Sequence, residues 1–121
     1  MKRDLDLIRA LLFEAEKLGL DDDVDAREIR LPPWTTEQII YHLRLLDQTG
    51  LVETIDTSTM SGRSCILRGL LPPGHDYLDT VRNETIWIQI KNRLADQGVS
   101  ATLDIAKSLG TSLIAKALGL G

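Results

Sequence analysis

The sequence of 121 residues contains a single cysteine, which excludes an internal disulfide and any zinc site built from several cysteines. Only five residues are aromatic, so a folded core must be mainly aliphatic. No run of about 18 uncharged apolar residues is present to span a bilayer, and the first residues lack the apolar stretch of a secretory signal. We therefore expect a cytoplasmic protein that does not enter a membrane.

An excess of basic residues is also missing. The chain has 14 basic and 18 acidic residues, which gives a net charge of −4. Residues 1–31, 32–71 and 72–121 carry six, three and five basic residues against nine, four and five acidic ones. No segment therefore has a positive field that would draw it to nucleic acid or to an anionic membrane.

Helical periodicity is the strongest pattern that the sequence does contain. Apolar residues at spacings of three and four predict a first helix over residues 4–18. An acidic cluster follows at residues 21–25. We interpret it as a solvated loop, because it lacks the glycine and glutamate positions of a calcium-binding loop. Residues 28–31 are predicted to form a short strand that ends at Pro32.

A second helix is predicted from a cap at Thr35 or Thr36 to a stop at Gly50. Two short strands over residues 51–56 and 64–70 then form a hairpin with a polar tip. Between residues 74 and 97 the apolar face shifts near Asn83, which indicates a kink or two separate helices. The pattern after residue 100 predicts a last helix.

The stretch TTEQIIYHLRLLDQTGLVE is similar to the recognition helix and first wing strand of bacterial winged-helix regulators, and LLPPGHDYLD is similar to the segment that follows their wing. The order of helix, short strand, helix and hairpin is also that of a winged helix-turn-helix. The fold implied is mainly α with a small β-hairpin. Residues 1–71 would form the winged-helix-like domain, and residues 72–121 a helical extension that packs on it or serves dimerisation.

Taken together, the motifs MKRDLDLIR, YHLRLL and GHDYLD resemble an uncharacterised family of small bacterial and phage-associated winged-helix proteins, known as a domain of unknown function. One departure from ordinary winged helices concerns the segment before Trp34. It is acidic and bounded by prolines, where a separate short helix is usual, so the turn-helix half is expected to be reduced.

The resemblance implies a DNA-binding protein, such as a bacterial or prophage transcriptional regulator, that reads double-stranded DNA. The residue types suited to base or phosphate contacts predict a DNA-binding set: Thr36, Gln38, Tyr41, Arg44, Arg63 and Arg68. Because phosphate neutralisation supplies most nonspecific affinity, this function needs basic side chains gathered on one face, with Lys2 and Arg3 among them. Glu37 and Leu45 fit this function poorly, since a carboxylate repels phosphate and a leucine suits a protein partner.

The alternative is a protein interaction module without DNA binding, using the winged helix or the C-terminal helices. The last helix has a wide apolar face with small residues, and it either covers the core or forms the contact of a homodimer. Its proposed interface consists of Leu103, Ala106, Leu109, Leu113 and Ala117.

Catalysis has little support in the sequence. His42, His75 and Cys65 do not form a recognisable set of nucleophile, base and orienting group. We expect His42 to pack between the second helix and the wing, and Trp34 to close over that helix as a hydrophobic staple. The sequence thus predicts a non-enzymatic protein without cofactor or metal.

Overall fold

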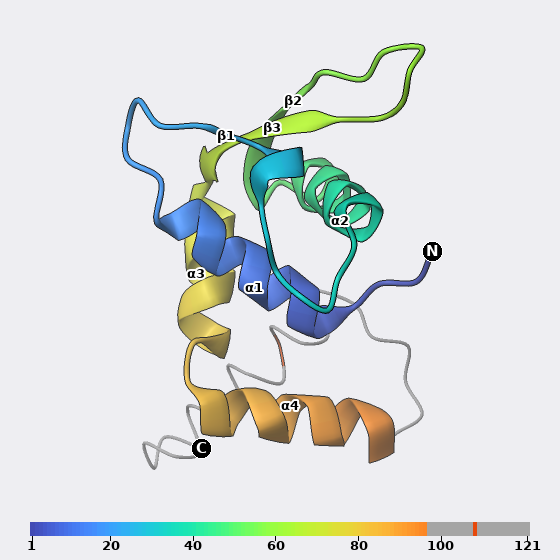
Figure 1. Cartoon of the computed structure of the whole chain (residues 1–121). Helices are drawn as coiled ribbons and strands as arrows, with labels where there is room; N and C mark the ends of the chain where they lie inside the picture. The colour runs from blue at the N-terminus through green and yellow to red at the C-terminus, as the bar shows by residue number, and fades with distance from the viewer. Residues whose placement is uncertain (97–107, 109–121) are drawn as a thin grey trace. The chain divides into compact units, whose positions relative to one another are not determined.

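The computed structural model describes residues 1–96 and 108, and the chain divides into two compact units, Met1–His75 and Asp76–Gly121 (Figure 1). The described part contains four α-helices, one short 3-10 helix and a three-stranded sheet. In chain order the elements are α1 (Leu5–Glu16), β1 (Val24–Asp25), η1 (Ala26–Glu28), α2 (Thr36–Gln48), β2 (Val52–Asp56), β3 (Cys65–Leu70), α3 (Pro72–Val81) and α4 (Glu84–Asp96). Within these residues, no helix has the length and apolar character needed to cross a membrane.

The first predicted helix is present as α1. Asp4 caps it, because its Oδ1 accepts a hydrogen bond from the backbone N–H of Leu7 at 3.2 Å and so satisfies a donor that the helix leaves free. The apolar stripe of α1 is buried and packs against α2 and β3. The predicted end at residue 18 was two residues too late, since Leu18 lies beyond the helix and is half-buried.

The sheet is antiparallel with the strand order β1-β3-β2, so the predicted hairpin gains a third strand. The prediction of a strand over residues 28–31 was wrong. The strand consists instead of Val24 and Asp25, which pair with Leu67 and Ile66 at the end of the acidic loop. Asp25 then stops the strand because its Oδ1 accepts the Arg27 N–H at 2.9 Å and begins the single turn of η1.

The second predicted helix is α2, and a capping box fixes its start. The Thr35 hydroxyl accepts from the Gln38 N–H at 3.2 Å, and Gln38 Oε1 accepts from the Thr35 N–H at 2.8 Å. Ahead of the cap, Trp34 lines a small cavity together with Ile39, the pair expected of a hydrophobic staple. These contacts set the direction in which the chain enters α2.

The sequence QTGLV ends α2. Gly50 has φ of 79°, and its N–H donates to the Asp47 carbonyl at 2.9 Å, while the Leu51 N–H donates to the Leu46 carbonyl at 2.9 Å. This pair of bonds is a Schellman motif, which needs a left-handed residue that glycine adopts without steric cost. The chain therefore turns directly from α2 into β2.

Two contacts hold the sheet on α2. Asp47 Oδ2 accepts from both the N–H and the hydroxyl of Thr54, and the buried side chains of Cys65 and Leu67 on β3 point into the core. β2 and β3 pair from Val52 to Asp56, with a shift of register between Glu53 and Thr54. The core between α1, α2 and the sheet is almost wholly aliphatic, as the scarcity of aromatic residues predicted.

The break predicted near Asn83 is confirmed. α3 ends at Val81, and Asn83 Oδ1 accepts from the Ile86 N–H at 3.0 Å to cap α4. Both helices bury one face, and Trp87 is almost fully buried. The proposed interface residues Leu103, Ala106, Leu109, Leu113 and Ala117 lie outside the described residues.

Candidate functional site

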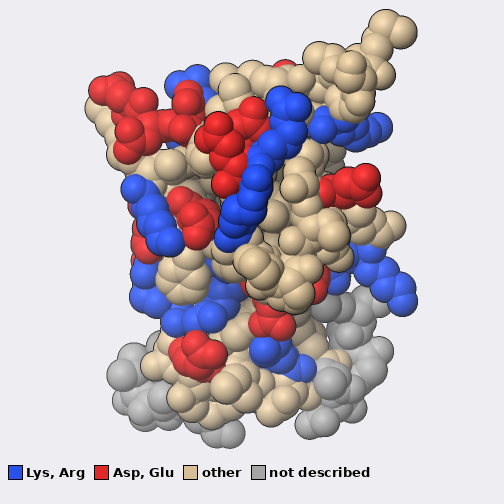
Figure 2. Space-filling view, viewed as in Figure 1, with Lys and Arg blue, Asp and Glu red and all other residues tan. Residues whose placement is uncertain are grey.

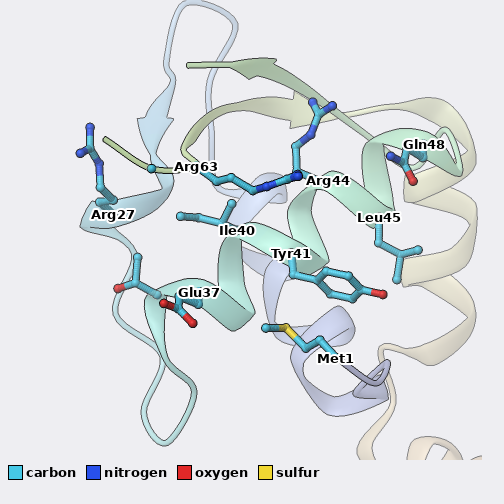
Figure 3. A pocket seen from close by; sticks show the side chains of 11 residues that line it. Met1, Arg27, Glu37, Ile40, Tyr41, Arg44, Leu45, Gln48 and Arg63 are labelled. Carbon is cyan, nitrogen blue, oxygen red and sulfur yellow. The ribbon is translucent and has the colours of Figure 1, made fainter. Parts of the chain in front are cut away.

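A groove of about 720 Å³ runs over the exposed face of α2 (Figure 3). Residues from α2, from η1, from the tip of the β2–β3 hairpin and from the start of the chain line it. Four members of the predicted DNA-binding set are among them: Thr36, Tyr41, Arg44 and Arg63. The structure therefore brings together side chains that are up to 27 residues apart in the sequence, counted from Thr36 to Arg63.

The floor of the groove is apolar. Ile40, Tyr41 and Leu45 lie on α2 at the spacing of one helical face, and Met1 lies beside Tyr41 (Figure 3). Tyr41 is 40% exposed, and its ring meets the His42 ring edge-on with centroids 5.4 Å apart. The hydroxyl of Tyr41 consequently stands at the surface, where it can donate a hydrogen bond to a ligand.

Three arginines surround this floor, each from a different element. Arg27 belongs to η1, Arg44 to α2 and Arg63 to the hairpin tip, and one carboxylate, Glu37, accompanies them. The groove lining thus has an excess of positive charge although the whole chain has a net charge of −4. Acidic side chains gather over the loop between α1 and β1 (Figure 2), which contains Asp21, Asp22 and Asp23.

Neighbouring groups hold two of these arginines in place. Arg44 Nη1 lies 4.0 Å from Asp47 Oδ2 and 3.5 Å from the Thr54 hydroxyl. Arg27 Nη2 lies 3.5 Å from Asp25 Oδ2. These ion pairs are solvent-exposed, so each stabilises the fold by less than about 1 kcal/mol and leaves the guanidinium able to exchange its partner for a phosphate.

Gln38 and Arg68, the remaining two members of the predicted DNA-binding set, do not line the groove. Gln38 is occupied in the capping box of α2. Arg68 is exposed on β3 between inward-facing positions, and its Nε lies 4.0 Å from Asp23 Oδ2 beside the acidic loop. The capping role of Gln38 could have been predicted from the sequence TTEQ. The direction of the Arg68 side chain could not, because it depends on the register of the sheet.

A junction that the sequence analysis missed joins the start of α1 to Trp34 and α2. The backbone N–H of Asp4 donates to His42 Nε2 at 2.9 Å, and Trp34 Nε1 donates to Asp4 Oδ2 at 2.9 Å. His42 Nδ1 lies 2.7 Å from the Gln38 carbonyl. Because Nε2 accepts from the Asp4 N–H, we assign the donor role to Nδ1, which then donates to the Gln38 carbonyl. The junction joins the first motif, MKRD, to the central motif, YHLRLL.

The groups considered for catalysis lie in different surroundings. His42 is buried in the junction, whereas His75 is exposed in the first turn of α3. Cys65 is buried in β3, and desolvation raises the pKa of its thiol to about 11. A thiol with such a pKa is almost entirely protonated at neutral pH and is a poor nucleophile.

The fold and the groove define a small mixed α/β protein in which arginine side chains line a groove on the exposed face of α2. The chain belongs to the family described as "Hypothetical protein (DUF2513)", whose model matches residues 2–100. It is also 36% identical, over 122 residues, to a Haemophilus influenzae protein named "Uncharacterized protein"; the match covers 98% of this chain and 99% of that one. No solved structure matches the chain. The expectation of a domain-of-unknown-function family is confirmed.

Proposed function

We propose that the chain is a winged-helix DNA-binding protein of the transcription-regulator class, in which α2 enters the major groove. Its element order supports this: helix, short strand, one turn of helix, helix, then hairpin. The single turn of η1 stands where the reduced helix was expected, and β1 closes the sheet beside the hairpin. At 13 residues, α2 is roughly 20 Å long, a length that fits along a major groove about 12 Å wide.

The observation that carries the proposal is the position of three arginines around the exposed face of α2. A helix inserted in the major groove has a phosphate backbone on each side of it. Arg44 stands on the helix itself, while Arg27 and Arg63 come from η1 and from the hairpin tip and line the same groove. Guanidinium groups gathered beside a reading helix are suited to phosphates, and such contacts fix its register on the duplex.

Measurement of DNA affinity as a function of salt concentration tests this function. Wild-type protein should select fragments from a genomic library at low salt, and its binding constant should fall as salt rises. Arg44→Ala and Arg63→Ala should each lower the slope of log K against log salt by about 0.9, because each removes one phosphate contact. Arg68→Ala is the matched control and should leave the slope unchanged, since Arg68 faces Asp23 outside the groove. Folded protein that binds no fragment at low salt would contradict the proposal.

The apolar floor of the same groove favours a second candidate function, recognition of a protein partner. Ile40, Tyr41 and Leu45 present an apolar surface that DNA phosphates do not use. In that case Leu45→Asp should abolish capture of a defined partner, and Arg63→Ala should have little effect. The opposite order of effects would support DNA as the ligand.

A further inference from the structure

The first three residues of the chain lie against the groove. Met1 is one of the side chains that line it, and it lies next to Tyr41 (Figure 3). Lys2 and Arg3 follow, both exposed, before Asp4 adopts an extended conformation with φ of −121° and ψ of 111°. Two exposed basic residues that belong to no helix or strand therefore connect Met1, which lines the groove, to Asp4.

Asp4 fixes the point from which this segment leaves the fold. Its N–H is bound to His42 Nε2, its Oδ2 to Trp34 Nε1 and its Oδ1 to the Leu7 N–H. The first of these bonds matters most for the segment, because His42 belongs to α2 and directly follows Tyr41. Three extended residues span about 10 Å, so Lys2 and Arg3 must stay near the α2 surface whatever rotamers they adopt.

We propose that residues 1–3 form a DNA-binding arm, in which Lys2 and Arg3 bind backbone phosphates and His42 is the positioning residue that holds the arm beside α2. The inference rests on the proposed function and extends it to three residues that belong to no helix or strand. The arm brings two positive charges, next in sequence to Met1 of the groove lining, in addition to the three arginines of the groove. Because Asp4 is held by three hydrogen bonds, Lys2 and Arg3 are tethered close to the fold and their charges act at a high effective concentration.

The main experiment compares the double variant Lys2→Ala/Arg3→Ala with the control Lys17→Ala/Arg68→Ala on one DNA fragment. Both variants remove two exposed basic side chains, and the control residues Lys17 and Arg68 lie next to Glu14 and Asp23, away from the start of the chain. The arm variant should lower the slope of log K against log salt by about 1.8, which corresponds to roughly 60-fold weaker binding at 0.1 M salt. The control should keep the wild-type slope.

A second measurement isolates the role of His42. His42→Phe keeps a ring in the buried site but removes the acceptor of the Asp4 N–H. It should weaken DNA binding several-fold in the wild-type background and should have no effect in the Lys2→Ala/Arg3→Ala background, because the arm then has no charge to position. A merely structural role would weaken both backgrounds equally.

The outcomes separate this inference from the proposed function. Failure of the wild-type protein to bind any DNA fragment overturns the DNA-binding function itself. Wild-type binding with an unchanged salt slope in Lys2→Ala/Arg3→Ala overturns the arm and leaves that function standing. If His42→Phe does not fold, the salt slope of the exposed double variant still decides whether the arm binds DNA.

Discussion

Replacement of Asp4 by alanine is the most direct test of the junction between α1, Trp34 and α2. The substitution removes two interactions of the carboxylate, the N-cap bond to the Leu7 N–H and the bond to Trp34 Nε1. It leaves the bond from the backbone N–H to His42 intact, because that donor does not depend on the side chain. The change therefore measures the side chain of Asp4 alone.

The expected loss follows from the two interactions. Loss of an N-cap costs about 1 kcal/mol, with a range of 0.5–2. A hydrogen bond to a charged group is worth about 1.5–3 kcal/mol when buried, and since Asp4 is half-buried we take about 1 kcal/mol. Asp4→Ala should thus lower the free energy of unfolding by about 2 kcal/mol. Asp4→Asn should lose less than half as much, because asparagine also caps a helix.

Urea unfolding followed by circular dichroism measures this loss as a shift of the midpoint at constant m-value. Trp34→Phe in the Asp4→Ala background provides a further check, because the indole bond is already absent there and its removal should add little. Asp21→Ala is the matched control, an exposed aspartate in the acidic loop whose replacement should change the stability by no more than about 0.5 kcal/mol. An Asp4→Ala protein as stable as the control would refute the junction.

Three further predictions concern other parts of the fold. Gly74→Ala should destabilise the protein by about 1–3 kcal/mol or prevent folding, since a Cβ there would overlap the Leu51 carbonyl oxygen; thermal melting measures the loss. Cys65 should react with a thiol reagent only after the protein unfolds, because burial raises its pKa to about 11; rapid labelling of native protein would contradict this. The Arg27 backbone N–H lowers the pKa of Asp25, so this carboxylate contributes stability that is present above its unfolded pKa of about 3.9 and is lost as pH falls through its lower folded pKa. Asp25→Asn should accordingly weaken the dependence of the urea midpoint on pH in that window.

Local patterns in the sequence were sufficient to predict most of the elements. Periodic apolar residues determine α1 and α2, because a helix buries one face whatever it packs against. The cap at Thr35 and the stop at Gly50 are equally local, since each satisfies backbone groups within a few residues. The hairpin and the break at Asn83 follow from turn and cap chemistry in the same way.

The strand between α1 and α2 is an element whose position local sequence patterns did not predict. A two-residue strand has no periodicity of its own, and Val24 and Asp25 are a strand only because β3 offers them partners. Residues 28–31 pair with no strand of the sheet, and Ile29 is instead buried after the turn of η1. The position of β1 therefore depends on its pairing with the distant strand β3.

The candidate site, too, could be predicted from the sequence only in part. The sequence by itself determined that α2 has an exposed face with Tyr41 and Arg44, because helical spacing places both opposite the buried stripe. Only the tertiary structure decided which distant side chains join them. The hairpin returns Arg63 to α2, the Asp4–His42 bond brings Met1 there, and the register of β3 turns Arg68 toward Asp23 instead. Long-range packing and backbone hydrogen bonds set these positions, and neither has a signature in the local sequence.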